Sequence, residues 1–293
     1  MRSANGFTCL PLMAFLMLAA AILSHAPSRT AVADDVPSYL APQKKEATAA
    51  RLTSRAVVQR IFQTPPNTRP DLQAADLANL DLAELDFKGA LLAGANLYGA
   101  DLTNARLAGA SLVGAELDRA TITATDFSNA DLTDARIIRP TVFTSLQVAS
   151  KEAPNFSGAK LVRFRSDGQF DRTNFTGADL TEAVIGRSAT REPAVNARAS
   201  LVHANFTRAN LRNARLAETS LQYARFNDAD LRGADLSGCD LAKADFSGAD
   251  LAGTNLTGAN LAEANLRTAR GLDKVVGLEK AVNLDAAHRA AIP

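Results

Sequence analysis

The side chains with the clearest capacity for binding chemistry are arginines in the middle of the chain. Between positions 136 and 198 the sequence has ten Lys or Arg against six Asp or Glu. Five of these cations are candidate contacts for an anionic ligand or an acidic partner: Arg163, Arg165, Arg187, Arg191 and Arg198. A guanidinium binds carboxylate or phosphate through paired hydrogen bonds. The alternative interpretation is that these are ordinary solvated loop charges.

Carboxylates twenty positions apart offer a second kind of chemistry. Asp81 with Asp101, and Asp230 with Asp250, could hold a hard cation such as calcium. Hydrolytic chemistry on paired carboxylates would need a cleft with one raised and one normal pKa, and nothing in the sequence singles out such a pair. The favoured interpretation is that each carboxylate accepts hydrogen bonds from nearby backbone groups. Once an export signal is removed, histidine remains only at His203 and His288. The sequence therefore predicts no catalytic residue, no cofactor-binding residue and no metal ligand.

A strict five-residue period must position all of these side chains. From Leu72 to Ile137, and again from Leu201 to Leu266, an apolar residue recurs at every fifth position. Five residues fit neither the turn of an amphipathic helix nor the alternation of a strand. A repeat architecture is therefore considered first.

Small residues accompany each apolar centre of the repeat. Alanine stands two positions before most centres, where only a small side chain fits, and glycine often stands two positions after, where a corner requires relaxed backbone angles. Phe206, Phe226 and Phe246 recur every twenty residues. Four repeats per turn would therefore stack these rings on one side.

These features resemble the pentapeptide-repeat family, whose pattern A(D/N)LXX stands here at 95–99, 234–238 and 259–263. The resemblance covers residues 71–270. It implies an all-β solenoid, a right-handed quadrilateral β-helix with the central Leu or Phe inside and short flanking helices, and it implies no catalytic residues. Composition agrees, because hydrophobic residues make up 47% of the chain while aromatic residues make up only 5%.

The period is disturbed between the two regular runs. Changes of register predict inserted loops near 144–154, 163–169 and 187–199. Counting apolar centres places the second and third insertions at one corner, as a shared protrusion bearing the candidate arginines, and the first insertion at the opposite corner. Loops on a rigid scaffold commonly carry function.

Residues 1–33 have the features of a signal peptide. Arg2 precedes an apolar stretch from Leu10 to Leu23 that is short for a membrane span, and 31–33 form a small-x-small cleavage site. Cleavage after Ala33 predicts a periplasmic or secreted protein with no stable membrane span; an uncleaved anchor is the alternative. Cys239 would then be the lone cysteine, a small buried filler.

Flanking segments are expected to cover the ends of the solenoid. Residues 34–70 contain a linker and an amphipathic pattern from Gln43 to Gln63, and residues 271–293 supply a C-terminal cap. Covering the open first coil is the favoured role of the N-terminal helix. Binding of a membrane surface or partner is the alternative, through Lys44, Lys45, Arg51, Arg55 and Arg60. Because terminal helices mediate dimers in some members of the family, a homodimer is considered.

The predicted function is that of an exported, non-enzymatic scaffold or protein-interaction module, without cofactors, whose partner is an unidentified protein or anionic ligand. The alternative is a ligand-binding protein or enzyme with its site on the inserted basic loops. DNA mimicry, by which some members of the family inhibit type II topoisomerases, is a weaker alternative. One side reads Asn210, Asp230, Asp250 and Arg270 at intervals of twenty, so uncharged and cationic residues break the acidic stripe that mimicry requires. The export signal argues against mimicry more strongly, and no nucleic acid is expected as a partner.

Overall fold

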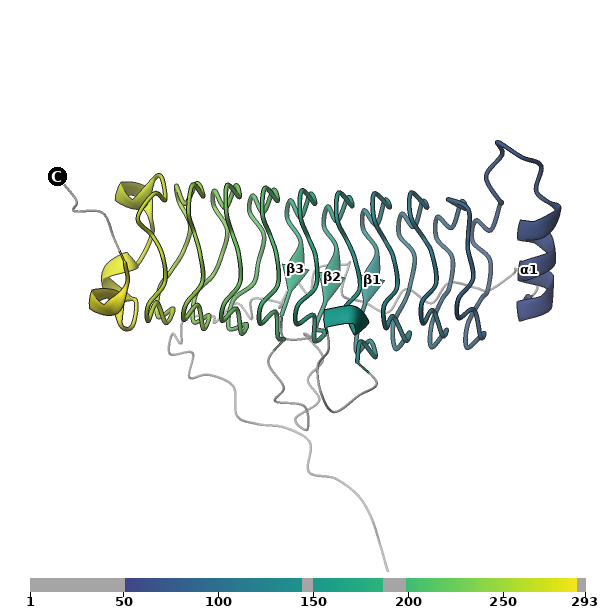
Figure 1. Cartoon of the computed structure of the whole chain (residues 1–293), viewed down its shortest axis with the longest axis horizontal. Coiled ribbons are helices and arrows are strands. Elements are labelled where there is room, and N and C mark those ends of the chain that lie inside the picture. The colour runs from purple at the N-terminus through teal and green to yellow at the C-terminus, as the bar shows by residue number, and fades with distance from the viewer. Residues whose placement is uncertain (1–50, 144–149, 187–198, 289–293) are drawn as a thin grey trace, which may run out of the picture. The chain divides into compact units, whose positions relative to one another are not determined.

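The computed structural model describes residues 51–143, 150–186 and 199–288. All of them lie in one compact unit, residues 45–293. A single α-helix is followed by a stack of coils in which strand pairing is reduced mainly to isolated parallel bridges (Figure 1). Within these described ranges, no helix is both long enough and apolar enough to cross a bilayer.

Helix α1 spans Ser54–Gln63 and lies across the first coil (Figure 1). The Thr53 hydroxyl caps it by accepting from the Ala56 N–H at 3.2 Å. Its inward residues Val57 and Ile61 are buried against the core. The helix begins at Ser54 and does not include residues 51–53, which the sequence pattern had placed within it. Residues 43–50 of that pattern lie outside the described ranges.

Four pentapeptides make one coil. Parallel bridges join residues twenty positions apart, as in Asp71 with Leu91 and Asp76 with Asn96. We call the four rows of bridges the first, second, third and fourth sides; they begin at Asp71, Asp76, Asp81 and Asp86. Where bridges follow one another closely they form three short parallel strands in the second side, β1 (Arg136–Ile137), β2 (Arg165–Ser166) and β3 (Val184–Ile185).

Backbone hydrogen bonds close each five-residue unit. The N–H of Leu97 donates to the Glu116 carbonyl of the next coil at 2.7 Å, and the N–H of Ala100 donates to the Leu97 carbonyl at 3.1 Å. The first bond links coils and the second closes a turn. Because this pattern repeats through the regular units, their backbone groups are satisfied without long strands.

The apolar centres fill the interior of the coils. Leu97, Leu117, Leu231 and Leu251 are all 0% exposed, so the inward assignment is confirmed. Six rings stack in the fourth side at centroid distances of 4.8 to 5.3 Å, nearly parallel: Phe127, Phe156, Phe175, Phe206, Phe226 and Phe246. This confirms the stack predicted from the twenty-residue spacing.

Corners fall two residues after each centre and require positive φ. Glycine holds many of them, for example Gly94 at φ 65° and Gly233 at φ 69°. Other corners carry longer side chains in the same conformation, including His203 at φ 60° and Tyr223 at φ 59°. A non-glycine residue at positive φ strains the backbone. The corner rows therefore present outward-facing side chains from a strained backbone conformation.

The predicted insertion at 163–169 is wrong. Bridges there join residues nineteen apart, as in Asn155 with Asn174 and Lys160 with Asp179, so this coil is one residue shorter than the standard twenty. Ser166 is the inward centre that the sequence pattern hid, and it is only 3% exposed. Because the chain stays within the coil, no protrusion forms at these residues.

The other two interruptions are true insertions at neighbouring corners. Asp126 bridges Asn155, 29 positions away instead of twenty, so nine extra residues lie between the third and fourth sides. Gln169 bridges Ser200, 31 positions away, so eleven extra residues lie between the second and third sides. The opposite corners predicted for them were wrong because Ser166 had not been counted as a centre.

The described part of the first insertion packs back onto the coils. Its 3₁₀ turn η1 spans Ser150–Glu152, and the Glu152 carbonyl accepts from the Ala124 N–H at 2.7 Å. Residues 144–149 and 187–198 lie outside the described ranges.

The coil continues past residue 270. Bridges from Arg270, Val276, Val282 and His288 to the preceding coil occur every six residues. Three 3₁₀ turns supply the extra residue of each side: η2 (Leu272–Lys274), η3 (Leu278–Lys280) and η4 (Leu284–Ala286). Val276 and Val282 are about half exposed at this end, at 54% and 51%.

Candidate functional site

The structure does not assemble the predicted arginine cluster from the residues it describes. Arg163 lies at a corner after the first side, where its Nε and Nη2 donate to the two Asp134 oxygens at 2.7 and 2.6 Å. Glu182, one coil further, also acts on it electrostatically, and Asp134 and Glu182 together raise the pKa of Arg163. Arg163 is therefore committed to its neighbours in the stack.

Arg165 lies in the second side within β2, between Arg136 and Val184 of the adjacent coils. The remaining candidates, Arg187, Arg191 and Arg198, lie outside the described residues. The two described candidates thus belong to regular coil positions and not to a loop.

Rows of Asp and Asn before the centres hold the coils in register. Asp76 accepts from the Ala78 N–H at 3.2 Å and from the Asn96 side-chain amide of the next coil at 3.0 Å. The same pair of contacts recurs at Asp235, which accepts from the Ser237 N–H and from Asn255, both at 3.1 Å. This explains physically why the repeat favours Asp or Asn at this position: one oxygen closes a turn and links two coils.

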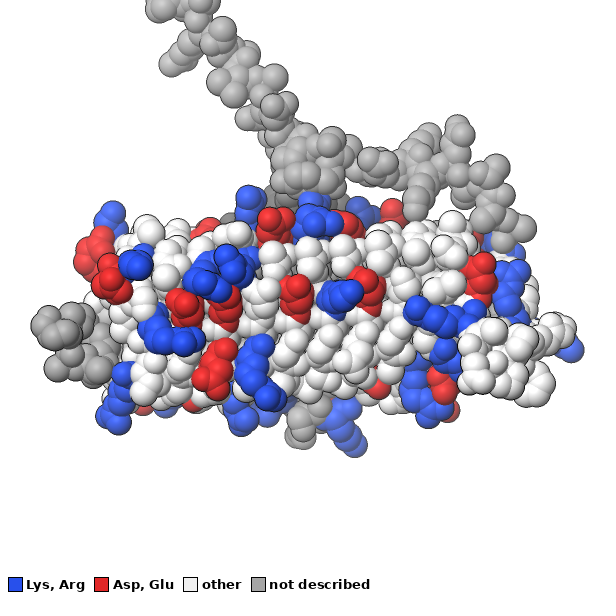
Figure 2. Space-filling model, turned by 90° about the horizontal axis from the view of Figure 1, so that it is seen from above, with Lys and Arg blue, Asp and Glu red and all other residues white. Residues whose placement is uncertain are grey.

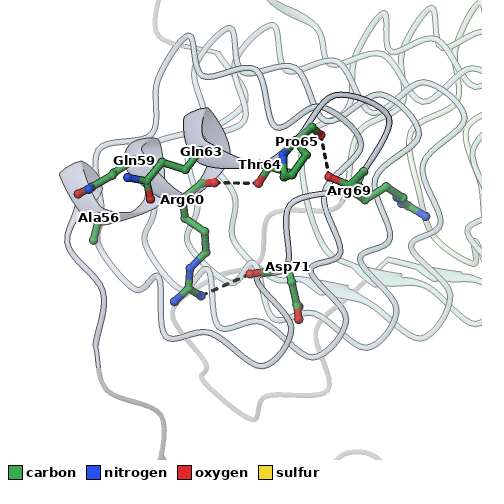
Figure 3. A pocket seen from close by; sticks show the side chains of 9 residues that line it. Ala56, Gln59, Arg60, Gln63, Thr64, Pro65, Arg69 and Asp71 are labelled. Carbon is green, nitrogen blue, oxygen red and sulfur yellow. Dashed lines mark hydrogen bonds between the residues drawn. The ribbon is translucent and has the colours of Figure 1, made fainter.

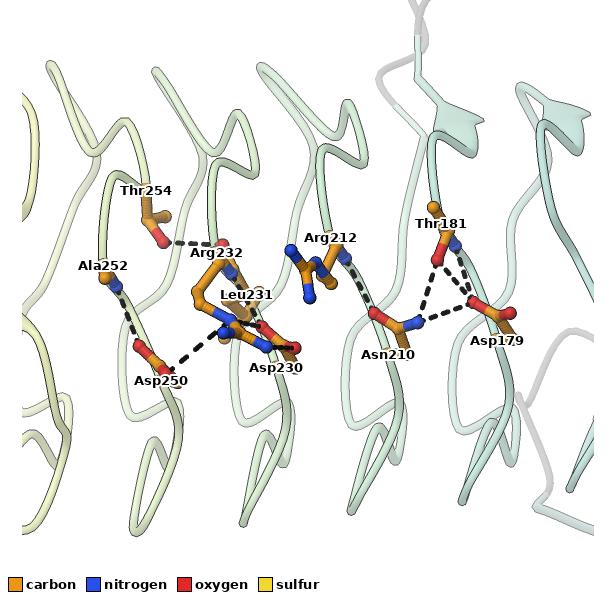
Figure 4. A network of polar contacts seen from close by, with 10 residues as sticks. All are labelled: Asp179, Thr181, Asn210, Arg212, Asp230, Leu231, Arg232, Asp250, Ala252 and Thr254. Atoms are coloured by element: carbon orange, nitrogen blue, oxygen red, sulfur yellow. Dashed lines mark hydrogen bonds and ion pairs between the residues drawn. The ribbon is translucent and has the colours of Figure 1, made fainter.

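In the first side, an arginine lies between two of these carboxylates (Figure 4). Arg232 contacts Asp230 through Nε at 2.8 Å and Nη2 at 2.5 Å, and its Nε lies 3.7 Å from Asp250. The hydrogen bond from Arg232 lowers the pKa of Asp230. The Arg232 guanidinium thus lies between Asp230 and Asp250, where the sequence pattern had suggested a metal cation.

A partly buried ion pair marks the second side. Arg136 contacts Asp118 through Nε at 3.1 Å and Nη2 at 2.6 Å, and the Ile138 N–H donates to the same carboxylate at 3.0 Å. Burial raises the pKa of Asp118 despite these favourable contacts. The pair locks adjacent coils together at the start of β1.

One corner row combines ring stacking with charge. His203 stacks on Tyr223 with centroids 4.7 Å apart, and Lys243 Nζ lies 5.5 Å from the Tyr223 ring and 3.7 Å from Glu263. Partial burial and the nearby Arg172 lower the pKa of His203. Sequence reasoning missed this row, although its members stand twenty residues apart at the corner position.

An open depression of about 690 Å³ lies between α1 and the first coil (Figure 3). Arg60 reaches from α1 across it and donates to the Asp71 carbonyl at 3.3 Å. Arg69, also in its lining, donates to the Gly89 and Gly109 carbonyls of two successive coils. These bonds attach the helix and its linker to the solenoid.

The surface seen in Figure 2 has acidic and basic side chains interspersed among broad uncharged areas. Several red and blue groups lie directly beside one another on this face. This face therefore has no continuous acidic stripe.

Metal and thiol chemistry have little support in residues 51–143, 150–186 and 199–288. No group of three or more His, Cys, Asp or Glu in these ranges could hold a metal ion. Cys239 is buried in the column of small residues, where its thiol donates to the Leu216 carbonyl at 2.9 Å. Burial raises the pKa of this thiol to about 11.

Solved structures with similar coils include HetL, a pentapeptide repeat protein involved in heterocyst differentiation regulation from the cyanobacterium Nostoc sp. strain PCC 7120. It is 24% identical, with 81% of this chain and 95% of that chain covered and a TM-score of 0.42. QnrB1, a plasmid-mediated fluoroquinolone resistance protein, is 21% identical in its full-length structure, with 62% and 89% covered and a TM-score of 0.33.

A pentapeptide repeat protein from the thylakoid lumen of Arabidopsis thaliana is 28% identical, with 42% of this chain and 76% of that chain covered and a TM-score of 0.23. No curated protein matches the chain.

The family model described as pentapeptide repeats (8 copies) matches residues 71–109, 100–137, 199–238 and 234–270. These are the two regular runs of the sequence and the coils whose Leu and Phe centres are buried. Residues 71–137 and 199–270 of this chain therefore belong to the pentapeptide-repeat family.

Proposed function

We propose that this protein is an exported, non-enzymatic scaffold, a right-handed four-sided β-helix that presents side chains to a protein partner or an anionic ligand. The observation that supports this most is that its charged and amide side chains are engaged in contacts within the stack. Arg163, Arg232 and the Asp and Asn rows bind one another and the backbone across coils. Groups used in this way rigidify a surface and are not free to act on a substrate.

Export is the second part of the proposal, and it rests on residues 1–33 of the sequence. The chain would be cleaved after Ala33 and would work in the periplasm or outside the cell. Cell fractionation followed by mass measurement of the intact protein tests this. A periplasmic or secreted protein beginning at Asp34 is expected, and a protein that retains residues 1–33 in the membrane fraction would contradict it.

The scaffold role is tested by affinity purification of the exported protein. A partner should be captured by the wild type, and substitution of Arg187, Arg191 and Arg198 to Gln should leave capture intact if the coil faces make the contact. Arg163→Gln is a matched control, because this guanidinium is paired with Asp134 in the stack.

The alternative, a ligand site on the inserted loops, is supported by their position at neighbouring corners, with one complete coil between them. Loss of capture in the Arg187, Arg191 and Arg198 variant, with capture retained in Arg163→Gln, would favour it over the scaffold.

DNA mimicry is the weaker alternative. The arrangement of Arg232 between Asp230 and Asp250 counts against it, because a cation interrupts the negative row of the first side. If this protein inhibited DNA supercoiling by a purified type II topoisomerase, DNA mimicry would be favoured over the scaffold.

A further inference from the structure

The outward face of α1 leaves two apolar side chains in water at the N-terminal end of the coils. Phe62 is 82% exposed and Val58 is 48% exposed, whereas Val57 and Ile61 of the same helix are buried. Residues four apart are neighbours on a helix surface. Val58 and Phe62 therefore form one apolar patch that faces away from the solenoid.

This end of the molecule is also positively charged. Residues 51–69 contain four arginines and no Asp or Glu. Arg51 donates to the Ala78 carbonyl, Arg60 to the Asp71 carbonyl and Arg69 to the Gly89 and Gly109 carbonyls. These acceptors are neutral, so the contacts fix the guanidinium groups in place without cancelling their charge.

The fourth arginine, Arg55, is exposed on α1, and its guanidinium makes no hydrogen bond or ion pair with the described residues. The acidic residues of the first coil begin only at Asp71, behind this layer. Two of them already have partners: Asp71 accepts from the Gln73 N–H at 3.1 Å, and Asp86 pairs with Arg106 at 3.0 Å.

We propose that this end of the protein binds an anionic membrane surface. A helix that exposes Phe beside cationic side chains has the chemistry of an interfacial helix, whose apolar side chains enter the boundary between headgroups and acyl chains. The arginines would meet lipid phosphates, to which a guanidinium binds well. Since α1 lies across the end of the stack (Figure 1), the coils would extend away from the bilayer and leave their sides free.

This inference goes beyond the scaffold function and does not depend on export, because binding is measured on purified protein. Phe62 and Val58 supply a small apolar area, so binding is expected to be weak and reversible and to respond to salt. Each arginine near an anionic surface strengthens binding by about fivefold.

A single fluorescent reporter tests the proposal. The chain contains no tryptophan, so Phe62→Trp in the purified protein places one indole in the patch. We expect its emission to shift to the blue on addition of phosphatidylglycerol vesicles, to remain unchanged with phosphatidylcholine vesicles, and to return as salt is added. Because position 62 is largely exposed, the substitution should not disturb folding.

Matched variants identify the contact. In vesicle sedimentation, Val58→Ser and Arg55→Gln should each weaken binding about fivefold. Val276→Ser and Arg267→Gln, at the opposite end of the coils, should leave it unchanged; Val276 is 54% exposed and so matches Val58 in exposure.

Three results would overturn the proposal. A blue shift that grows with protein concentration in the absence of vesicles would assign the patch to a second copy of the chain. Equal binding to both lipids would remove the role of charge. Vesicle binding that Val58→Ser leaves intact would assign the contact to another segment, such as an apolar stretch at 10–23 that remains attached.

Discussion

Phe164 and Ser166 exchange the large and the small side chain of a normal repeat. The Phe164 ring, 0% exposed, occupies the column that alanine holds in most coils, and Ser166 occupies the inward position that Leu or Phe holds elsewhere. The Ser166 hydroxyl donates to the Ile137 carbonyl at 2.5 Å and accepts from the Gly168 N–H at 3.2 Å. The large ring thus fills the space that the small side chain leaves, in a coil that is one residue short.

This exchange predicts that the two residues are coupled. Phe164→Ala should lower the free energy of unfolding by about 3 to 5 kcal/mol because it leaves a cavity, and Ser166→Leu by about 1 to 3 kcal/mol because it overpacks the coil. The double variant should lose less than the sum of the two. A double-mutant cycle by urea unfolding measures this, and strict additivity would show that the sizes do not compensate.

Corner conformation predicts a cost for any side chain added at a glycine corner. Gly258 has φ +69° and a Cβ there would meet nothing within 4 Å, so Gly258→Ala should lose about 1 kcal/mol through backbone strain alone. Ala74 has φ 51°, and Ala74→Gly is the reverse test, which should gain part of that energy. Thermal unfolding of both variants is the measurement; a Gly258→Ala protein as stable as the wild type would refute the assignment of strain.

The contact between Asp230 and Arg232 predicts a specific pH dependence. Since the hydrogen bond from Arg232 lowers the pKa of Asp230, the contact stabilises the fold above the ordinary carboxyl value of 3.8, and this contribution is lost as the pH falls through the lowered value. Asp230→Asn should therefore lose less than about 1 kcal/mol at neutral pH.

At pH values below the lowered pKa, the Asp230→Asn variant and the wild type should become equally stable. Urea unfolding across this range provides the measurement. Asp250→Asn is the control with a smaller expected loss, because its carboxylate lies 3.7 Å from Arg232. A difference that persists unchanged in acid would contradict the ionic origin of the effect.

Cys239 should be unreactive while the coils are intact. Its thiol is buried and its pKa is raised to about 11, and the thiolate is the reactive form. Alkylation by iodoacetamide near neutral pH should therefore be slow in native protein and fast in urea. Rapid alkylation of the native protein, with its circular dichroism unchanged, would show that the thiol is accessible.

The interior of the coils could be predicted from the sequence because the period itself encodes it. Leucine at every fifth position, alanine beside it and phenylalanine every twenty residues specify which side chains point inward and how many repeats make a coil. These features depend on local spacing alone, and Leu97, Leu231 and the Phe206 stack lie where the pattern places them.

The candidate site could not be predicted in the same way. Ser166 is polar, so an apolar search passed over it, and a one-residue deletion was interpreted as an insertion. Arg163 pairs with Asp134, 29 positions earlier in the chain. This separation includes the first insertion, and the number of inserted residues becomes clear only from the bridges between coils. The exposure of Phe62 could not be predicted because the adjacent Ile61 is equally apolar, and the sequence does not show which of the two faces the core; Ile61 is the buried one.

The inward direction of the repeat centres is tested most directly by one pair of variants. Leu236 is 0% exposed, and Ser237 beside it is partly exposed. Leu236→Asp would force an unpaired charge into the core, whereas Ser237→Asp would place the same charge at the surface. Thermal unfolding followed by circular dichroism should show loss of the cooperative transition, or a large fall in Tm, for Leu236→Asp and little change for Ser237→Asp. An unchanged Tm in Leu236→Asp would contradict the inward assignment and with it the stacked coils.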